Sequence, residues 1–245
     1  MTTDRATVTI LVPALNEEKA LPATLVNLKA LDPPADEILL VDGGSSDATL
    51  QLAQVAGINT MVAARGRGPQ INEGVEAAKG DLVCVLHADS LLHLDAVAAI
   101  RDTMADQRIA LSSFTPLIKG PEKTRWFTTF HNFIKTYYAP AIMKPHLFIR
   151  GVRLLFGDHA MFFRREDYLK TGGIPGEATV MEEADLCIRF AELGKIKMIR
   201  KWVITSDRRI AEWGPLKANY IYLKIGILWC FGARKRLGQY YPDVR

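Results

Sequence analysis

Cysteine is scarce in this chain, and its few positions form no pattern. Cys84, Cys187 and Cys230 are odd in number, far apart and without metal-ligand spacing. This excludes a disulfide framework and gives no zinc motif, so we expect buried free thiols in a reducing compartment. Disulfides are also unnecessary, because 49% of the 245 residues are apolar and such a chain can bury a substantial core.

Long apolar runs are absent as well. No run reaches the roughly 18 residues that a membrane-spanning helix needs. The longest candidate near the C-terminus, residues 225–233, lies between Lys224 and Arg234. The first residues, Met-Thr-Thr-Asp-Arg, include no basic region followed by a long apolar stretch, so they predict no signal peptide. We therefore expect a protein of the cytoplasm.

Acidic charge is unevenly distributed, which the net charge of +4 hides. Residues 1–120 carry a net charge of −6, whereas residues 121–245 carry 22 Lys and Arg against 12 Asp and Glu. The basic half indicates an anionic partner, such as a phosphate-bearing substrate or a lipid surface, unless it is only a solvated face. Nucleic acid is not expected as a partner, because the basic residues are dispersed and no recognition motif is present.

The first 115 residues alternate between strand-like and helix-like patterns. The strand-like segments are apolar and rich in β-branched residues: 8–12, 37–41, 59–63, 82–86 and 109–115. The helical segments between them are 17–31, 48–56, 69–78 and 94–104. This alternation predicts an α/β fold with a mostly parallel central sheet and helices on both faces.

The rhythm changes in the second half. Residues 124–138 are aromatic and basic with helical spacing, and residues 156–163 are strand-like. Helices are expected at 182–193 and 215–231, the latter with an apolar stripe. No repeat, low-complexity segment or strong linker interrupts the chain, so residues 1–245 are expected to form a single domain.

Polar residues follow the first two predicted strands, at the edge where open α/β sheets bind ligands. Asp42 ends one strand and is followed by two glycines, which permit close backbone approach to a ligand. Its carboxylate suits a base N–H or a ribose, although an ordinary turn with a helix cap also explains this segment. Pro13, Asn16 and Glu17 follow the first strand, where Asn16 or Glu17 suits either a ribose contact or a cap.

A third set of polar residues precedes and follows the apolar strand 82–86. Arg65, Arg67 and Asn72 surround a tight glycine loop that suits phosphate recognition, unless the arginines are only surface charge. Asp89 lies just past the strand, where a carboxylate can hold Mg²⁺ or Mn²⁺ together with substrate phosphates. His87 either faces that diphosphate or packs as a structural histidine.

Acidic residues crowd the start of the predicted helix 182–193: Glu182, Glu183 and Asp185. The helix dipole favours acids at this end, which is a sufficient structural explanation. The functional alternative is that one of them protrudes into a cleft and acts as a general base. Close like charges would raise the pKa of one carboxyl, as such a role requires.

Together these segments resemble family-2 glycosyltransferases, which have the GT-A fold. The corresponding residues lie, in order, at 12–18, 41–47, 72–80, 87–90, 157–158, 164, 172–173 and 182–186. The resemblance covers about residues 7–240. It is most specific to the small bacterial branch described as transferase 2, radical-SAM/selenodomain-associated. That branch has V-D-G-G-S-x-D, R-G-R, H-A-D-[ST], F-G-D and M-E-[DE] in this order.

The resemblance implies a GT-A-type, Rossmann-like sandwich and an inverting transfer from a nucleotide-diphosphate sugar, by family habit a UDP-sugar. Residues from about 1 to 115 would bind this donor, and residues from about 116 to 245 would bind the acceptor and carry catalysis. Asp42 would contact the base, and Asp89 would hold a divalent cation, Mn²⁺ or Mg²⁺, on the diphosphate. Glu183 would deprotonate the acceptor hydroxyl.

Two positions depart from the broad family. The His87-Ala88-Asp89 motif stands where that family has Asp-x-Asp, and Glu183 stands where it has Asp. Glutamate is longer by one methylene and catalysis is sensitive to such displacements, so Glu182 and Asp185 stay alternative bases. Asp158 and His159 are further candidates for the acceptor side.

The acceptor and the cellular site follow from the resemblance only in outline. Many family-2 enzymes act on lipid-linked acceptors, which implies peripheral contact with the inner face of the membrane. The amphipathic helices at 124–138 and 215–231 suit that contact, unless they only cover the sheet. Two other functions stay open: a non-catalytic sugar-nucleotide-binding scaffold, and a related nucleotidyl- or phosphosugar transferase.

Overall fold

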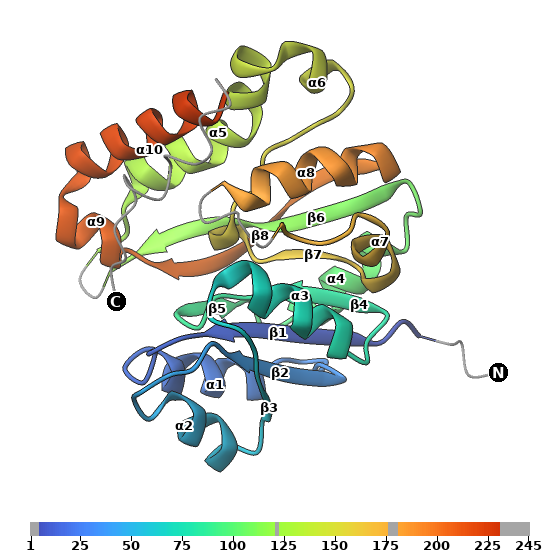
Figure 1. Ribbon diagram of the computed structural model, residues 1–245, viewed down its shortest axis with the longest axis vertical. Coiled ribbons are helices and arrows are strands. Elements are labelled where there is room, and N and C mark those ends of the chain that lie inside the picture. The colour runs from blue at the N-terminus through green and yellow to red at the C-terminus, as the bar shows by residue number, and fades with distance from the viewer. Residues whose placement is uncertain (1–4, 121–122, 176–180, 231–245) are drawn as a thin grey trace.

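One eight-stranded sheet runs through the molecule, with strand order β3-β2-β1-β4-β7-β6-β8-β5 and helices on both faces (Figure 1). The computed structural model describes residues 5–120, 123–175 and 181–230. Its strands are β1 (Val8–Ala14), β2 (Glu37–Asp42), β3 (Asn59–Val62), β4 (Leu82–Val85), β5 (Ser90–Leu92), β6 (Ile109–Lys119), β7 (Met161–Arg164) and β8 (Lys195–Ser206). Its helices are α1 (Leu21–Lys29), α2 (Thr49–Val55), α3 (Arg67–Ala77), α4 (Ala96–Met104), α5 (Trp126–Met143), α6 (Pro145–Ile149), α7 (Arg165–Lys170), α8 (Glu182–Leu193), α9 (Arg208–Trp213) and α10 (Pro215–Cys230).

The first half of the sheet is parallel. β3, β2, β1 and β4 pair in register as parallel neighbours, and nearly all apolar residues of the inner strands β1, β2 and β4 are buried on both faces, as a covered parallel sheet requires. Because side chains alternate along a strand, Leu11 and Val41 pack on the face covered by α3 and α8. Ile10 and Leu40 pack on the opposite face, which α1, α2 and α4 cover. The expected α/β fold with helices on both faces is confirmed.

The second half of the sheet mixes strand directions. β7 is antiparallel to both β4 and β6, β8 is parallel to β6, and β5 is antiparallel to β8. The expected strand at 156–163 is shorter in the structure: a 3-10 turn at Gly157–His159 and a left-handed residue, Ala160 at φ 46°, precede β7. Neither β5 nor β8 was predicted from the sequence.

Close packing of α3 on the sheet depends on a glycine. A Cβ at Gly74 would lie 2.6 Å from Leu11 Cδ1 and 2.8 Å from Val41 Cγ2, so only glycine permits this separation of helix and strands. The short distance brings the first turn of α3, which carries Arg67, down to the end of the sheet where several strands finish.

The described cysteine side chains lie in the core of the protein. Cys84 and Cys187 are buried free thiols, as expected, and burial raises the pKa of both. The Cys230 side chain lies outside the described residues. Within the part of the chain that the structure describes, no helix is both long and apolar enough to span a bilayer.

Candidate active site

Four strands deliver their carboxyl ends to one edge of the sheet. β1, β2 and β4 are parallel, and β8 runs the same way because the antiparallel strand β7 separates β4 from the parallel pair β6 and β8. Asp42 ends β2, and the segments that follow β1, β4 and β8 carry Glu17, Asp89 and Arg208. This edge is where open α/β sheets bind ligands.

Hydrogen bonds tie the loops after β1 and β2 to each other. Asn16, at φ 55°, donates its backbone N–H to Ser45 Oγ (2.9 Å) and accepts the N–H of Ser46 at Oδ1 (2.9 Å). Ser45 Oγ donates to Asp42 Oδ1 at 2.5 Å, while Asp42 Oδ2 accepts the N–H groups of Gly44 and Ser45. The buried Asp42 carboxylate therefore shapes its own loop, and a ligand N–H would have to share it with these donors.

Gln70 of α3 fixes the ends of β1 and β2 from one side. Its Nε2 donates to the carbonyls of Ala14 (2.7 Å) and Val41 (2.8 Å). Gly43 leaves room for this side chain, because a Cβ there would lie 3.0 Å from Gln70 Cδ. Pro13 lies in β1 opposite Val41. The two loops thus start from a rigid platform.

Arg208 joins the carboxylates of Glu17 and Asp89. Its Nη1 and Nη2 each lie 3.0 Å from one oxygen of Glu17, and Nη2 also donates to Asp89 Oδ2 at 2.8 Å. The bidentate geometry is the strong form of an arginine–carboxylate pair. Three segments far apart in the sequence therefore meet in one charged cluster.

The carboxylate oxygens of this cluster are the kind of ligand that a divalent cation prefers. Among the described residues, no three His, Cys, Asp or Glu side chains are grouped so that they could hold a metal ion. Glu17 and Asp89 supply hard carboxylate oxygens, and His87 Nδ1 lies 4.0 Å from Asp89 Oδ1. Because Mg²⁺ is commonly held by one or two carboxylates plus substrate phosphates, the residues fit a divalent cation that binds together with a diphosphate.

A second charged cluster joins α3 to the start of α8. Arg67 Nε lies 3.8 Å from Glu182 Oε1, and Arg67 Nη2 lies 3.4 Å from Glu183 Oε1. Both nitrogens are buried, and neither has a hydrogen-bond partner among the described residues. A Cβ at Gly157 would overlap the guanidinium, so this glycine makes its position accessible. Arg67 thus keeps two buried N–H donors beside a buried acidic pair.

The acidic pair has an unusual proton affinity. Burial, followed by the charge of Glu183, raises the pKa of Glu182 to about 8, while the positive charge of Arg67 lowers it. Both causes favour the protonated form of Glu182 over the ionised form. Repulsion between like charges contributes as the sequence suggested, but burial is the larger cause.

The acceptor-side candidates lie in the 3-10 turn before β7. Asp158 Oδ2 accepts a hydrogen bond from Asn132 Nδ2 of α5 (2.5 Å). His159 is fully buried, with Nε2 3.6 Å from Asp158 Oδ1. Burial lowers the pKa of His159 to about 4, so its ring is neutral at physiological pH. Of the two residues, only Asp158 is partly accessible.

Lys135 brings a positive charge to the same region. Its Nζ lies 3.8 Å from the centre of the Phe156 ring. Burial lowers the pKa of Lys135, and the negative charges of Asp158 and Glu183 oppose that shift. The inner side of α5 therefore contributes an amide and an amine near the acidic residues.

Two predicted phosphate-binding candidates lie outside these clusters. Arg65 is exposed. Asn72 Oδ1 accepts from the Tyr168 hydroxyl (2.6 Å) and the Ile174 N–H (2.8 Å), and its Nδ2 donates to the Ile174 carbonyl (2.7 Å). Asn72 thus anchors the loop after α7.

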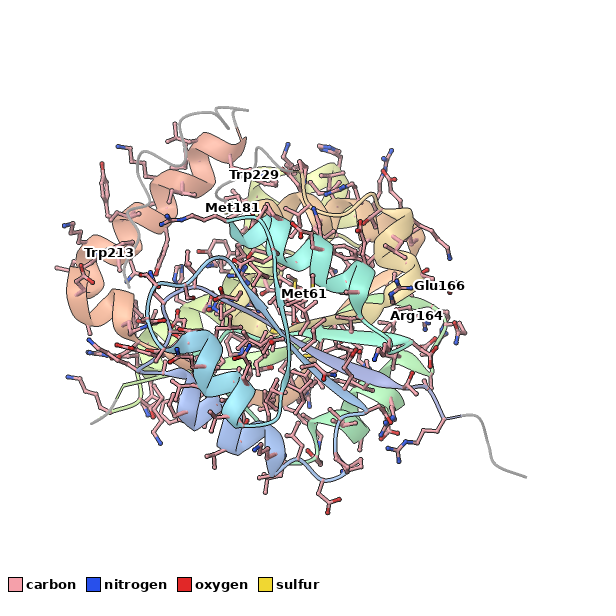
Figure 2. The ribbon with its side chains drawn as sticks, turned by 60° about the horizontal axis from the view of Figure 1, so that its bottom comes forward. Met61, Arg164, Glu166, Met181, Trp213 and Trp229 are labelled. Carbon is pink, nitrogen blue, oxygen red and sulfur yellow. The ribbon has the colours of Figure 1, made fainter. Side chains whose placement is uncertain are left out.

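Asp185, the third acid of α8, is turned toward α10. Its Oδ1 accepts a hydrogen bond from Trp229 Nε1 at 3.3 Å. In Figure 2, Trp213 of α9 and Trp229 mark the two ends of the α10 region, and Met181 is labelled close to Trp229. Met181 and Trp229 belong to one apolar cluster, so Asp185 helps to fix α10 on α8.

Two site residues were missed from the sequence. Arg208 follows β8, a half-buried strand whose lysines and arginines interrupt its apolar residues. Lys135 looked like one basic residue among many on an aromatic helix. Arg208 could have been predicted as a site residue from its position after a strand, next to Asp207. Lys135 could have been predicted from its place on the helix face opposite Trp126 and Phe130.

The comparisons with known sequences point to one family. Residues 9–173 match the model of "Glycosyl transferase family 2". An uncharacterized glycosyltransferase of Mycobacterium tuberculosis is 39% identical over 83 residues, which are 34% of this chain and 36% of that protein. A poly-beta-1,6-N-acetyl-D-glucosamine synthase of Staphylococcus aureus is 32% identical over 95 residues, 36% of this chain and 23% of that one. The matched segment spans about a third or less of these relatives.

The solved structures support the fold. A mannosyltransferase from Pyrobaculum calidifontis in complex with GDP-Man and Mn²⁺ superposes with a TM-score of 0.71 at 17% identity, covering 99% of this chain and 67% of that one. Glucosyl-3-phosphoglycerate synthase from M. tuberculosis, in complex with Mg²⁺ and UDP, gives a TM-score of 0.63 at 19% identity, covering 97% and 81%. S. aureus TarS in complex with UDP gives 0.61 at 16%, covering 84% and 62%.

The buried acidic pair predicts a pH-dependent stability. A carboxyl whose pKa is raised on folding stabilises the native state at low pH, and that contribution is lost as the pH rises from about 4.5 toward about 8. Glu182→Gln should therefore gain stability relative to wild type across this window, by up to about 1.4 kcal/mol per pH unit. Urea unfolding at several pH values measures the difference. Glu192→Gln, an exposed change on the same helix, should follow the wild-type curve. A Glu182→Gln curve parallel to wild type would show that this carboxyl is ionised throughout.

Proposed function

Because the chain belongs to glycosyl transferase family 2, we propose that it is an inverting, metal-dependent glycosyltransferase of the hexosyl type. It moves a sugar from a nucleotide-diphosphate sugar, by family habit a UDP-sugar, to an acceptor hydroxyl. The observation that carries this proposal is the convergence of Glu17, Asp89 and Arg208 at the carboxyl edge of the sheet. The motifs quoted above also support the transferase-2, radical-SAM/selenodomain-associated branch.

We assign donor binding to about residues 1–115, the first half of a single domain. Acceptor binding and catalysis are assigned to about residues 116–245. In the first half, the rigid loops with Asn16 and Asp42 suit the base and ribose. Pro13 and Glu17 would line the same place, and Arg65, Arg67 and Asn72 are the phosphate-side candidates. The similar solved structures hold GDP-Man or UDP, which supports a nucleotide donor without choosing between the two.

The diphosphate would lie against Asp89 and His87. Asp89, with Glu17 as neighbour, would hold the divalent cation, Mn²⁺ or Mg²⁺, which when bound acts as a Lewis acid on the departing diphosphate. Arg208 pairs with both carboxylates and offsets one of their two negative charges. Once a donor is present, its guanidinium is free to pair with phosphate oxygens instead, since arginine matches both partners. Such preorganised positive charge stabilises a leaving group as its negative charge develops.

The acceptor hydroxyl would lose its proton to Glu183. Its oxygen then attacks the anomeric carbon, the bond from that carbon to the diphosphate breaks on the opposite face, and the nucleoside diphosphate leaves with the electron pair. Glu183 is favoured over Glu182, because burial raises the pKa of Glu182 and so favours its protonated form. Asp185 is disfavoured by its bond to Trp229. Asp158 and Lys135, with the buried His159 behind them, suit the acceptor side.

We also propose that the acceptor is lipid-linked, and that the enzyme works in the cytoplasm at the inner face of the membrane. Two observations favour a second function, a non-catalytic sugar-nucleotide-binding scaffold: Arg208 already pairs with both Glu17 and Asp89, and His87 replaces a carboxylate. A related nucleotidyl- or phosphosugar transferase has no such observation in its favour.

A donor panel tests the proposal. Thermal unfolding with UDP, GDP and their sugars, with and without Mn²⁺, should show stabilisation by one nucleotide in wild type, because a ligand of the native state raises the melting temperature. Asp89→Ala should lose the Mn²⁺-dependent part, whereas Asp81→Ala, at the opposite end of β4, should keep it. Nucleotide binding that is equal with and without Mn²⁺ would contradict metal dependence. The absence of binding by any nucleotide would contradict the donor assignment.

Removing Arg208 should separate cation binding from catalysis. In Arg208→Gln the Asp89 carboxylate no longer has a competing guanidinium, so Mn²⁺ should bind more tightly in a titration. Turnover, followed as nucleoside diphosphate release, should fall by about 10²–10³ through loss of charge stabilisation. Arg200→Gln, an exposed change in β8, is the matched control. Weaker Mn²⁺ binding in Arg208→Gln would instead mean that Arg208 positions Asp89 for the cation.

Neutralising Glu183 should remove chemistry without removing donor binding. In Glu183→Gln, nucleoside diphosphate release should fall by about 10²–10⁴, the usual contribution of a general base. The nucleotide-induced thermal shift should stay that of wild type. If Glu182→Gln loses more activity than Glu183→Gln, the base is Glu182.

A further inference from the structure

Helix α5 is amphipathic in the reverse of the usual sense. Most of its buried side chains are small and polar, and all are at most 8% exposed: Thr128, Thr129, Asn132 and Thr136, together with the small apolar Ala139. Its outward side chains are large and apolar: Trp126, Phe127 and Phe130 are 62–75% exposed, and Phe133 and Tyr137 are partly so. A helix that only covered a core would present these rings inward.

The neighbouring helix α10 extends the same apolar surface. Leu216, Tyr220, Leu223 and Ile227 recur at helical spacing on one stripe and are 43–88% exposed. A hollow of about 220 Å³ opens on this stripe, lined by Tyr220, Leu223, Lys224, Ile227 and Leu228. Figure 1 shows α5 and α10 side by side at the end of the molecule away from α1 and α2, and the two helices are in contact. Ile142 of α5 and Ile149 of α6 are exposed as well.

The charged residues of these helices favour an anionic partner. Neither α5, α6 nor α10 contains a single Asp or Glu, while Lys123, Arg150 and Lys217 are exposed on them or at their ends. Exposed tryptophan and tyrosine together with purely cationic neighbours are typical of a surface that lies in the headgroup region of an anionic bilayer.

We propose that the outer face of α5 and α10, with α6, docks on an anionic lipid bilayer. This proposal rests on the proposed function and names the face through which the enzyme would reach its lipid-linked acceptor. The opposite side of α5 reaches the acceptor region: Asn132 donates to Asp158, and Lys135 lies within electrostatic reach of Asp158 and Glu183. One helix diameter, about 10 Å, therefore separates the bilayer surface from the acceptor-side residues.

Vesicle flotation without donor or acceptor tests the surface. Wild type should float with vesicles that contain about 30% phosphatidylglycerol at low salt, and should be released at about 0.5 M salt, where charge attraction is screened. The triple variant Trp126→Ser, Phe127→Ser and Phe130→Ser should bind at least about ten-fold more weakly. The matched control Val26→Ser, Val55→Ser and Val62→Ser removes equally exposed apolar residues at the other end of the molecule and should bind like wild type.

Other outcomes overturn the proposal. Wild type that stays with the unbound fraction at low salt contradicts it, as does a triple variant that floats like wild type. If light scattering shows a dimer that the triple variant converts to monomers and no vesicle binding is found, the surface belongs to a second copy of this chain. Unchanged circular dichroism and melting temperature confirm that the variant is folded. Because the assay contains no nucleotide, its failure leaves the donor-binding results, and hence the proposed transferase, unaffected.

Discussion

The direction of the strands is the constraint on which the site depends. A ligand at the end of a sheet meets only loops that leave the strands at that end. The single strand β7, antiparallel to both neighbours, lets β6 and β8 run parallel to β1, β2 and β4 although they belong to the other half of the chain. Arg208 consequently reaches Glu17 and Asp89 across some 190 and 120 residues of sequence. If β8 ran in the opposite direction, Arg208 would lie at the other end of the sheet, away from Glu17 and Asp89.

Electrostatics within the site follows from burial. In the Glu17–Asp89–Arg208 cluster, one guanidinium bridges two carboxylates that are still partly accessible. In the second cluster, Glu182 and Glu183 are more deeply buried and Arg67 approaches without forming a hydrogen bond. The first arrangement pairs its acids directly with a guanidinium, whereas in the second burial raises the pKa of Glu182 and favours its protonated form. Two acidic clusters of similar composition thus acquire different chemistry.

The sequence was most predictive where local pattern and tertiary structure agree. The parallel strands β1, β2 and β4 are continuous apolar runs, and the helix 182–193 was located at its observed limits, because periodicity alone defines such elements. β8 was missed because one of its faces is largely solvent-exposed and carries lysines and arginines. The partners of Asn72 and Asp185 were equally beyond reach, since each bond joins segments whose contact only the packed fold creates. The roles assigned to the site residues stay predictions.

The polar inner side of α5 has a thermodynamic consequence. The helix is fixed through hydrogen bonds, such as the one from the Ile118 N–H to Thr129 Oγ1 and the one from Asn132 to Asp158, and it hides hydroxyls where most helices hide rings. Less apolar area is removed from water here than at a contact made by buried rings, so its formation changes the heat capacity less. The attachment of α5 should therefore weaken less on cooling than a contact between large apolar side chains. Because hydrogen bonds are directional, they also fix the position of α5 along its own axis. A force on the aromatic side of α5 could not shift the helix by one turn without breaking these hydrogen bonds.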